Sequence, residues 1–444
     1  MIAGIIEFAS RVKYGMTSRN VPIYLFRPLD PKLTLCIVGS SLQTNVNTLA
    51  VVDVPYWNPT GLSRGHVVSI IGKCGDFEAE QKALVIQYSP NTWNKNLTFT
   101  FPSLDRKTIY GHTFNVDPPD CKDIDDVFTF GDDGYYYITI ADVAEWIKLN
   151  PFVTEKAHRN GQTLYDNGKV VRPMIPFEEH CSLVPRCYRL GISLRFRIDN
   201  CQVYDISFHK TQIVNDESYT YNSIQTSVYA PKLREISHIL SGQDSVDSHD
   251  WIASLMIFYN LEAANFLREC GHGILRMHES PDEDKLAKYS QLGVSADILA
   301  MKSAVYVSAT TANPRHWGLE ANAYTHATSP IRRFADIINQ FVLKGEEPPV
   351  YSLELLNERT KELKKYERDS FFLRQLEPSS KNKCVDGITL NDHRVWIPDW
   401  KRIVTCKNQF PEGTKGTVYF SLDMTKSTWK RRMVFRFEEA GYMG

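Results

Sequence analysis

Five aspartates crowd into one short segment, which runs from Asp117 to Asp126 as DPPDCKDIDD. Carboxylates packed this closely repel one another unless a cation neutralises them. Magnesium is the hard, oxygen-preferring ion that suits such donors, and it keeps bound waters for chemistry. Two such ions could activate an attacking water and stabilise the leaving oxygen of a phosphodiester. The segment therefore predicts a metal-dependent phosphodiesterase centre.

Two other interpretations of this segment stay open from its residues alone. A calcium loop that starts at Asp117 needs Gly at its sixth place and Glu at its twelfth, but Lys122 and Phe128 stand there. A solvated acidic loop is the other alternative. The apolar residues Val116, Val127 and Phe128 that flank the segment favour a buried site instead.

A second cluster of chemical groups occupies residues 324–338, YTHATSPIRRFADII. We expect a helix here with Ser329 as its N-cap and Pro330 at its first position. The free N–H groups of a helix start, together with Arg332 and Arg333, would bind a phosphate or its transition state. The alternative is an ordinary capped helix whose arginines pair with acidic residues.

The elements that must position these groups follow a three-part plan. The first 90 residues contain short apolar runs divided by Gly, Pro, Asn and Ser, which predict a small barrel. A polar stretch resembling a linker follows. The middle mixes strands and helices, with a buried strand expected at 135–143. The last 65 residues return to β alternation and predict a second small barrel.

Two long helices are expected in the middle region. Apolar residues recur at helical spacing over 252–267, and Gly271 follows as a stop. Residues 353–376 have a charged helical pattern that Ser352 would cap and that must end before Pro378.

The C-terminal region has a local basic bias, whereas the whole chain carries a net charge of −1. Between Lys401 and Arg432, eight Lys and Arg face two acidic residues. Aromatic side chains lie among these charges, and they could stack on bases or could fill a barrel core. They are Trp396, Trp400, Tyr419, Phe420 and Trp429.

Composition narrows the class of protein. The apolar runs are too short for a membrane span, and the N-terminus lacks a basic region before its apolar run, so we expect no membrane partner and no secretion signal. Nine cysteines without a CxxC pair fit a reducing compartment. An intracellular protein is therefore expected, with the cytoplasm as the first expectation and the nucleus as the alternative.

Both clusters resemble motifs of the RNase II/RNase R (RNB) exoribonucleases, particularly the exosome catalytic-subunit branch without its PIN domain. The aspartates match a D-x5-D-x-D-D signature, and THATSPIRRFAD is similar to a T-S-P-I-R-R-Y-x-D block. ITIADVAEWI, RPMIP…CSL, RMHESPD and KYERDS match further motifs in the same order. The resemblance covers nearly the whole chain.

The resemblance implies a multidomain α+β protein with two oligonucleotide-binding (OB) barrels around a catalytic domain. Residues 1–88 would form a cold-shock-like OB barrel, 89–112 a linker, 113–376 the mixed α/β RNB catalytic domain, and 377–444 an S1-type OB barrel.

The same resemblance implies processive 3′→5′ hydrolysis of single-stranded RNA to nucleoside 5′-monophosphates with Mg²⁺, for which Mn²⁺ would substitute. It assigns the metals and the attacking water to Asp117, Asp123, Asp125 and Asp126, and the scissile phosphate to Arg332. No motif position asks for Asp120. The residues expected to contact RNA are Tyr165, Tyr221, Tyr324, His326, Arg333 and Glu367. Among them, Tyr165 would stack on the 3′-terminal nucleotide, Tyr221 would line the RNA path and Glu367 would hold the 3′ end.

The sequence departs from the family pattern at a few positions. Ala253 and Ser254 replace a common Glu pair, Phe334 replaces Tyr, and Ala327 replaces Phe. A non-catalytic RNA-binding protein on an RNB scaffold is therefore kept as an alternative, and a metal-dependent DNase is a third. We expect a monomer, with membership of an RNA-processing complex as the alternative.

Overall fold

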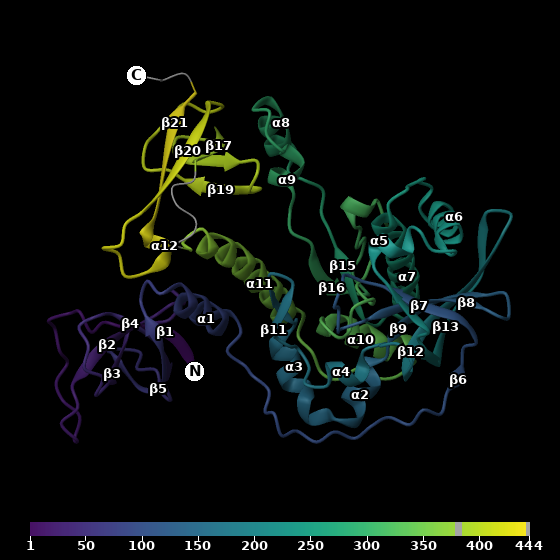
Figure 1. Cartoon of the computed structure of the whole chain (residues 1–444), viewed down its shortest axis with the longest axis horizontal. Helices are drawn as coiled ribbons and strands as arrows, with labels where there is room; N and C mark the ends of the chain where they lie inside the picture. Colours follow the sequence, from purple (N-terminus) through teal and green to yellow (C-terminus); the bar gives the residue numbers. More distant parts are fainter. Residues whose placement is uncertain (378–383, 441–444) are drawn as a thin grey trace. The chain divides into compact units, whose positions relative to one another are not determined.

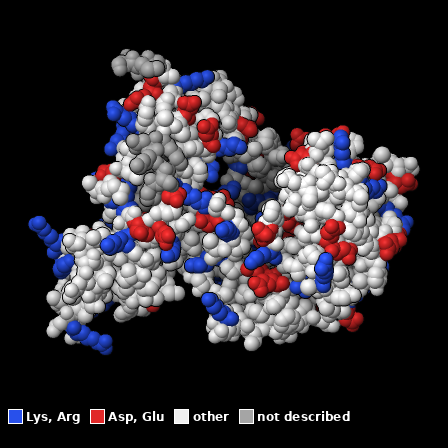
Figure 2. Space-filling view, in the orientation of Figure 1, with Lys and Arg blue, Asp and Glu red and all other residues white. Residues whose placement is uncertain are grey.

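The protein forms two compact units in a computed structural model that describes residues 1–377 and 384–440 (Figure 1). The barrel unit comprises Met1–Thr92, Pro281–Lys302 and the described part of Glu362–Gly444. The sheet unit comprises Trp93–Ser280 and Ser303–Lys361. No helix in the described residues is both long and apolar enough to cross a membrane. Basic and acidic side chains are interspersed on the face shown in Figure 2.

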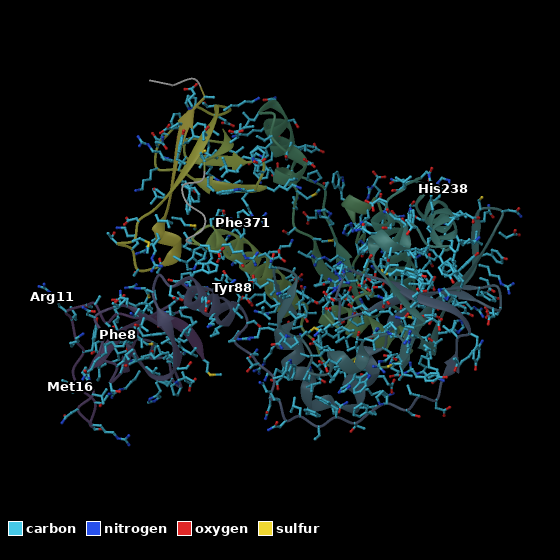
Figure 3. All side chains as sticks on the ribbon, in the orientation of Figure 1. Phe8, Arg11, Met16, Tyr88, His238 and Phe371 are labelled. Atoms are coloured by element: carbon cyan, nitrogen blue, oxygen red, sulfur yellow. The ribbon has the colours of Figure 1, made fainter. Side chains whose placement is uncertain are left out.

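The N-terminal strands close into a barrel, as predicted, in the order β1-β2-β3-β5-β4. Their bounds are β1 Ile2–Ile6, β2 Ile23–Pro28, β3 Cys36–Gly39, β4 Thr48–Asp53 and β5 Ser63–Lys73. Phe8 packs into the barrel core, whereas Arg11 and Met16 project from the loop after β1 (Figure 3). The sequence pattern missed helix α1, Phe77–Tyr88, which Asp76 caps through Ala79 N–H at 2.8 Å.

The C-terminal strands form a five-stranded sheet in the order β19-β18-β17-β20-β21. Their bounds are β17 Cys384–Thr389, β18 Arg394–Ile397, β19 Arg402–Thr405, β20 Lys415–Leu422 and β21 Met433–Glu439. A bridge between Cys406 and Phe435 brings the sheet's two edges together. Parts of the predicted 377–444 domain, residues 378–383 and 441–444, lie outside the described residues.

The C-terminal aromatic residues divide between core and surface. Trp396, Phe420 and Trp429 are buried, so they pack the unit's interior. Tyr419 is 44% exposed on β20, and Trp400 packs edge-on against Phe371 at 5.6 Å. Tyr419 is thus the most exposed of these five aromatic residues, and Trp400 is half-buried.

Three polar contacts hold the barrel unit together across long sequence distances. The Arg432 guanidinium of α12, Trp429–Arg432, pairs with Glu80 of α1 at 2.8 Å, and both side chains are almost fully buried. Asp369 of α11, Leu353–Arg374, accepts hydrogen bonds from the Tyr88 hydroxyl and the Lys430 ammonium. These contacts join both ends of the chain to α11. The unit also contains α8, Glu283–Gln291, and α9, Ala296–Ala300.

The sheet unit is built on seven strands in the order β14-β7-β8-β9-β12-β13-β6. The edge strands β14 and β6 are parallel to their neighbours, and the other pairs are antiparallel. The bounds are β6 Lys107–Thr108, β7 Gly111–Val116, β8 Asp126–Gly131, β9 Tyr136–Ala141, β12 Tyr188–Asp199, β13 Gln202–Val214 and β14 Glu217–Tyr219. The predicted strand at 135–143 is β9.

Alternating side chains on the central strands fill a separate core on each face of this sheet. Val127 and Ala141 face the core that contains Ile337 of α10, Phe334–Leu343. Phe128 and Ile138 face the core that contains α7, Ser248–Cys270. Gly271 ends α7 in the left-handed conformation at φ 68°, as the sequence predicted.

The remaining elements of the sheet unit are short. They are α2 Val143–Leu149, α3 Thr154–Asn160, β10 Leu164–Asp166, β11 Lys169–Arg172, α4 Glu178–Cys181, α5 Tyr221–Ile224, α6 Ala230–Ser241, β15 Ile274–Met277 and β16 Val305–Ser308.

Some predicted bounds differ from the elements observed. The expected linker 89–112 contains β6 and the start of β7, which both pair within the sheet. The expected catalytic region 113–376 contains Pro281–Lys302 and the second half of α11, which pack in the barrel unit. The predicted helix at 353–376 is α11, and Ser352 caps it by accepting from Leu355 N–H at 3.1 Å.

The Glu80–Arg432 pair predicts a large change in stability. Replacing Glu80 with Ala leaves a buried guanidinium without its counter-ion, so we expect the free energy of unfolding to fall by about 3 kcal/mol. Chemical denaturation measures this change. Glu78→Ala in the same turn is the matched control, because the Glu78 side chain is 82% exposed and should contribute almost nothing. Equal losses in the two variants would contradict the assignment.

Candidate active site

The loop between β7 and β8 brings the predicted aspartates together at one edge of the sheet. β7 ends at Val116 and β8 begins at Asp126, and the two strands are antiparallel. Asp117 therefore lies near Asp126, and the loop between them supplies Asp123 and Asp125. Asp120 turns outward at a left-handed position with φ 63°, which fits its omission from the predicted site.

Three of the four aspartates have a partner within the protein. Asp117 accepts a hydrogen bond from the Asn115 amide at 2.9 Å. Asp123 accepts from the Tyr165 hydroxyl. Asp125 accepts from Ile331 N–H at 2.9 Å through Oδ1, and its Oδ2 lies 3.6 Å from Arg332 Nε.

Burial makes charge on these carboxylates unfavourable. It raises the pKa of Asp125 to about 8, although Arg332 and the Ile331 N–H oppose the shift. Burial also raises the pKa of Asp126 well above its usual range, and the negative charge of Asp117 adds to this shift. The pKa of Asp117 is raised by burial and by Asp123. The cluster therefore needs a positive charge beyond that of Arg332.

The donor chemistry fits magnesium, because the cluster offers hard carboxylate oxygens that repel one another. No three His, Cys, Asp or Glu side chains within residues 1–377 and 384–440 converge on a single point that could enclose an ion. The carboxylates point to Asn115, Tyr165, Ile331 and Arg332 instead. Binding an ion would thus require some of these side chains to exchange a protein partner for the metal.

The predicted helix start at Ser329 is wrong. Residues 329–332 form a turn, and α10 begins only at Phe334 with Arg333 as its N-cap. The backbone of Arg333 pairs with Gln162, and Phe334 N–H donates to the Gly161 carbonyl, so the extended Arg333 separates the turn from α10. No helix N-terminus therefore adds to the side chain of Arg332.

The two adjacent arginines have different environments. Arg332 is half-exposed, with its guanidinium between Asp125 and the Ser329 hydroxyl. Arg333 is bound through Nε and Nη2 to the buried carboxylate of Asp336, at 3.2 and 2.8 Å. Arg332 is therefore available to a phosphate beside the aspartates, whereas Arg333 is held by an internal ion pair. The predicted RNA contact of Arg333 stays a prediction.

Two of the predicted aromatic residues lie beside the acidic cluster. Tyr165 on β10 contacts Asp123 directly. Tyr221 begins α5 and stacks on the His249 ring at 3.9 Å. Burial together with the charges of Asp117 and Asp126 raises the pKa of Tyr221 to about 12.

The other predicted RNA contacts lie elsewhere. Tyr324 is buried, and its hydroxyl accepts from the Asn260 amide at 3.0 Å. His326 Nδ1 lies 3.0 Å from the Tyr306 hydroxyl, and burial lowers the pKa of His326 far below its usual range. Glu367 is an exposed residue of α11 in the barrel unit. The RNA contacts of these residues stay predictions.

The sequence analysis missed Glu178, a residue of α4 that is affected by this cluster. Burial and the negative charge of Asp123 raise the pKa of Glu178 to about 7. The only sequence signal was its place just after the RPMIP stretch.

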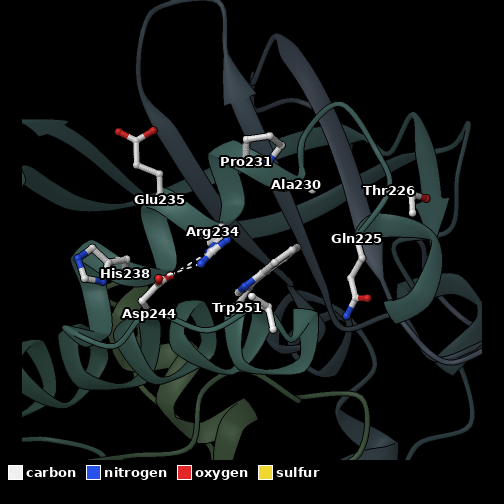
Figure 4. A pocket seen from close by; sticks show the side chains of 10 residues that line it. Gln225, Thr226, Ala230, Pro231, Arg234, Glu235, His238, Asp244 and Trp251 are labelled. Carbon is white, nitrogen blue, oxygen red and sulfur yellow. Dashed lines mark hydrogen bonds and ion pairs between the residues drawn. The ribbon is translucent and has the colours of Figure 1, made fainter.

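A groove of about 790 Å³ lies between α5, α6 and α7. Trp251 and an ion pair between Arg234 and Asp244 at 2.8 Å contribute to its walls (Figure 4). The groove contains none of the predicted site residues, so it is separate from the candidate active site.

Residues 106–239 and 230–346 match the RNB domain, and residues 23–89 match the Dis3-like cold-shock domain 2 (CSD2). The RNB match covers more than half of the chain. The chain belongs to the RNB family. This confirms the resemblance drawn from the aspartate and arginine motifs.

Curated relatives of this RNB protein match most of its length. Ribonuclease R of Buchnera aphidicola subsp. Schizaphis graminum is 24% identical over 431 residues, covering 72% of this chain and 59% of that protein. The probable exosome complex exonuclease RRP44 of Caenorhabditis elegans is 23% identical over 449 residues, covering 76% and 46%. The chain thus spans about half the length of these relatives.

Solved structures share its fold. Mycoplasma genitalium RNase R in complex with ribose-methylated single-stranded RNA has a TM-score of 0.75 at 17% identity, covering 98% of this chain and 90% of that one. Yeast Ssd1, described as a pseudonuclease, has a TM-score of 0.64 at 14% identity, covering 94% and 67%. The predicted α+β architecture of cold-shock barrel and RNB domain is confirmed.

The raised pKa of Asp125 predicts a pH-dependent stability in the absence of metal. Folded Asp125 keeps its proton up to about pH 8, whereas the unfolded chain releases it near pH 4. The folded state therefore binds more protons between these values, and its free energy of unfolding falls as the pH rises. Asp125→Asn removes this loss. In EDTA we expect it to exceed the wild type by about 2 kcal/mol or more at pH 8, and to match it near pH 4.

Urea denaturation at the two pH values measures the effect. Asp120→Asn is the control, because Asp120 is an exposed residue of the same loop. A stability difference between wild type and Asp125→Asn that does not change with pH would contradict the assigned shift.

Proposed function

We propose that this RNB protein is a magnesium-dependent 3′→5′ exoribonuclease that degrades single-stranded RNA processively to nucleoside 5′-monophosphates. The observation that carries the proposal is the approach of Arg332 to the buried Asp125 within a cluster of otherwise half-buried aspartates. Family membership supports ribonuclease chemistry in general. The metal requirement, the two-ion mechanism and the product rest on the chemistry of the cluster and on the family resemblance.

The carboxylates and the guanidinium of the cluster would have different roles at a phosphodiester: the carboxylates would hold metal ions, and the guanidinium would contact the phosphate. Bound Mg²⁺, or Mn²⁺ in its place, would supply the activated water and stabilise the leaving oxygen. Asp117, Asp123, Asp125 and Asp126 would hold these ions. Arg332 would donate hydrogen bonds to the scissile phosphate as its negative charge develops.

Two tyrosines beside the cluster would position the RNA. The Tyr165 ring would stack on the 3′-terminal nucleotide, and Tyr221 would line the path that leads to it. Glu367 would hold the 3′ end. We further propose an intracellular, mainly cytoplasmic protein that acts on single-stranded RNA as a monomer or within an RNA-processing complex.

The alternative is a non-catalytic RNA-binding protein, and the similar fold of Ssd1, which is described as a pseudonuclease, supports it. A non-catalytic RNA-binding protein would bind RNA and leave it intact. All four predicted metal aspartates are present in this chain, which favours the nuclease.

Hydrolysis is tested with 5′-labelled single-stranded RNA, with and without Mg²⁺. The wild type should produce a descending ladder that ends in a short limit product. Asp125→Asn should reduce the rate more than about 100-fold, because it removes a charge that the ions need, while RNA binding persists. Asp120→Asn should keep the wild-type rate. Intact RNA in both Mg²⁺ and Mn²⁺ would favour the pseudonuclease, and an equal rate on single-stranded DNA would refute RNA specificity.

The two arginines should differ in what they support. Arg332→Ala should lower kcat about 100-fold with a smaller loss of stability, because its guanidinium is half-exposed and lies 3.6 Å from its acidic partner Asp125. Arg333→Ala should lower the free energy of unfolding by about 3 kcal/mol, because Asp336 is then buried without its counter-ion. Single-turnover kinetics and denaturation on both variants check this division, and the opposite pattern would overturn it.

A further inference from the structure

Arg276 on β15 is a buried arginine that has no anionic partner. The residue is only 7% exposed, and its guanidinium lies over the Tyr306 ring at 4.5 Å. Its Nη1 is fully buried without a hydrogen-bond acceptor. No ion pair or side-chain hydrogen bond joins this guanidinium to any described residue.

Such a residue is costly to the folded protein. A buried guanidinium normally pairs with a carboxylate or with several carbonyl oxygens, because the interior cannot replace water around its charge. Burial lowers the pKa of Arg276, yet arginine keeps its proton in proteins. The ring of Tyr306 compensates for only a part of the lost hydration.

The surroundings of Arg276 supply one carboxylate for two guanidinium groups. Asp336 is an acidic residue within the electrostatic range of Arg276; its Oδ2 binds Arg333 and Ser329 N–H, and its Oδ1 is buried without a hydrogen-bond partner. His316 is neutral near pH 7, because burial and the charges of His278 and Arg276 lower the pKa of His316 to about 4. The region around Arg276 therefore has an excess of positive charge and an affinity for an anion.

This positive region continues towards the candidate active site. The half-buried ring of His326 lies within electrostatic range of both Arg276 and Arg332. Arg332 in turn reaches Asp125. Arg276 and Arg332 therefore act on the same part of the sheet unit, and an RNA strand with one phosphate at Arg332 would also be attracted by Arg276.

We propose that Arg276 binds a backbone phosphate of the RNA, on the 5′ side of the phosphate at Arg332. The assignment rests on the proposed function for the kind of ligand, and on the unpaired buried guanidinium for the site. The phosphate would supply a second negative charge, because Asp336 alone faces the two guanidinium groups of Arg276 and Arg333. Arg276 would thus act as a positioning residue that fixes the register of the RNA.

The test measures RNA binding in EDTA, where no hydrolysis occurs, by fluorescence anisotropy of a labelled single-stranded RNA. Arg276→Met keeps the length and apolar stem of the side chain and removes the charge. We expect its affinity to fall about tenfold and the slope of log K against log salt to decrease by about 0.7, the value for one lost phosphate contact. Arg315→Met, at an exposed neighbouring arginine, should change neither quantity as strongly.

Thermal denaturation without RNA separates ligand binding from a structural role. If Arg276 awaits a ligand, Arg276→Met should melt at or above the wild-type temperature, because a buried unpaired charge has been removed. A lower melting temperature with unchanged RNA affinity would overturn the proposal. Inorganic phosphate is the second probe, and stabilisation by phosphate with no effect of Arg276→Met on RNA binding would assign the site to a free anion and also overturn it.

A single methylphosphonate placed in turn at each RNA linkage locates the contact. At one linkage the methylphosphonate should weaken binding to the wild type and leave binding to Arg276→Met unchanged. If no linkage behaves in this way, a specific phosphate contact of Arg276 is contradicted. All these measurements are made without metal. Failure of RNA hydrolysis would therefore refute the proposed nuclease, whereas the Arg276 site is tested only by RNA binding in EDTA.

Discussion

The buried carboxylate of Asp125 is the constraint on which the candidate site depends. It accepts from the backbone of Ile331 and faces Arg332, so one side chain joins the β7–β8 loop to the turn before α10. These segments are 206 residues apart in the sequence. A charge placed there is unstable without positive partners, and Arg332 is the partner that the protein itself supplies. The seven-stranded sheet supports this arrangement by holding β7 and β8 in register.

Buried charge divides the arginines of the sheet unit by role. Arg333 has a carboxylate partner in Asp336, so its charge is used within the fold. Arg332 shares Asp125 at 3.6 Å and remains half-exposed, which leaves hydrogen-bond donors for a substrate. Arg276 is buried, as Arg333 is, and it has an unpartnered hydrogen-bond donor, Nη1. The ionic partner of each arginine thus indicates its role better than its position in a sequence motif does.

The sequence predicted the parts of the fold that depend on local pattern. Alternating apolar residues located β9 and the N-terminal barrel, and Gly271 and Ser352 marked the ends of helices where local backbone chemistry decides them. The helix start at Ser329 was mistaken because Gln162 and Gly161 hold the following residues extended, and a local pattern carries no sign of such distant partners. Composition likewise gave no sign that Pro281–Lys302 packs in the barrel unit. The aspartates were found from their charge density, whereas their separate hydrogen-bond partners needed the structure.

The Glu80–Arg432 pair also has a consequence for the order of folding. Its members are 352 residues apart, and the whole sheet unit is inserted in the chain between them. A ribosome releases Glu80 and α1 long before Arg432 exists, so the sheet unit can fold while that carboxylate still lies in water. Closing so long a loop is slow, and it becomes favourable only when the C-terminal strands are present to pack. The barrel unit should therefore mature after the sheet unit during synthesis, although α1 is made before the sheet unit.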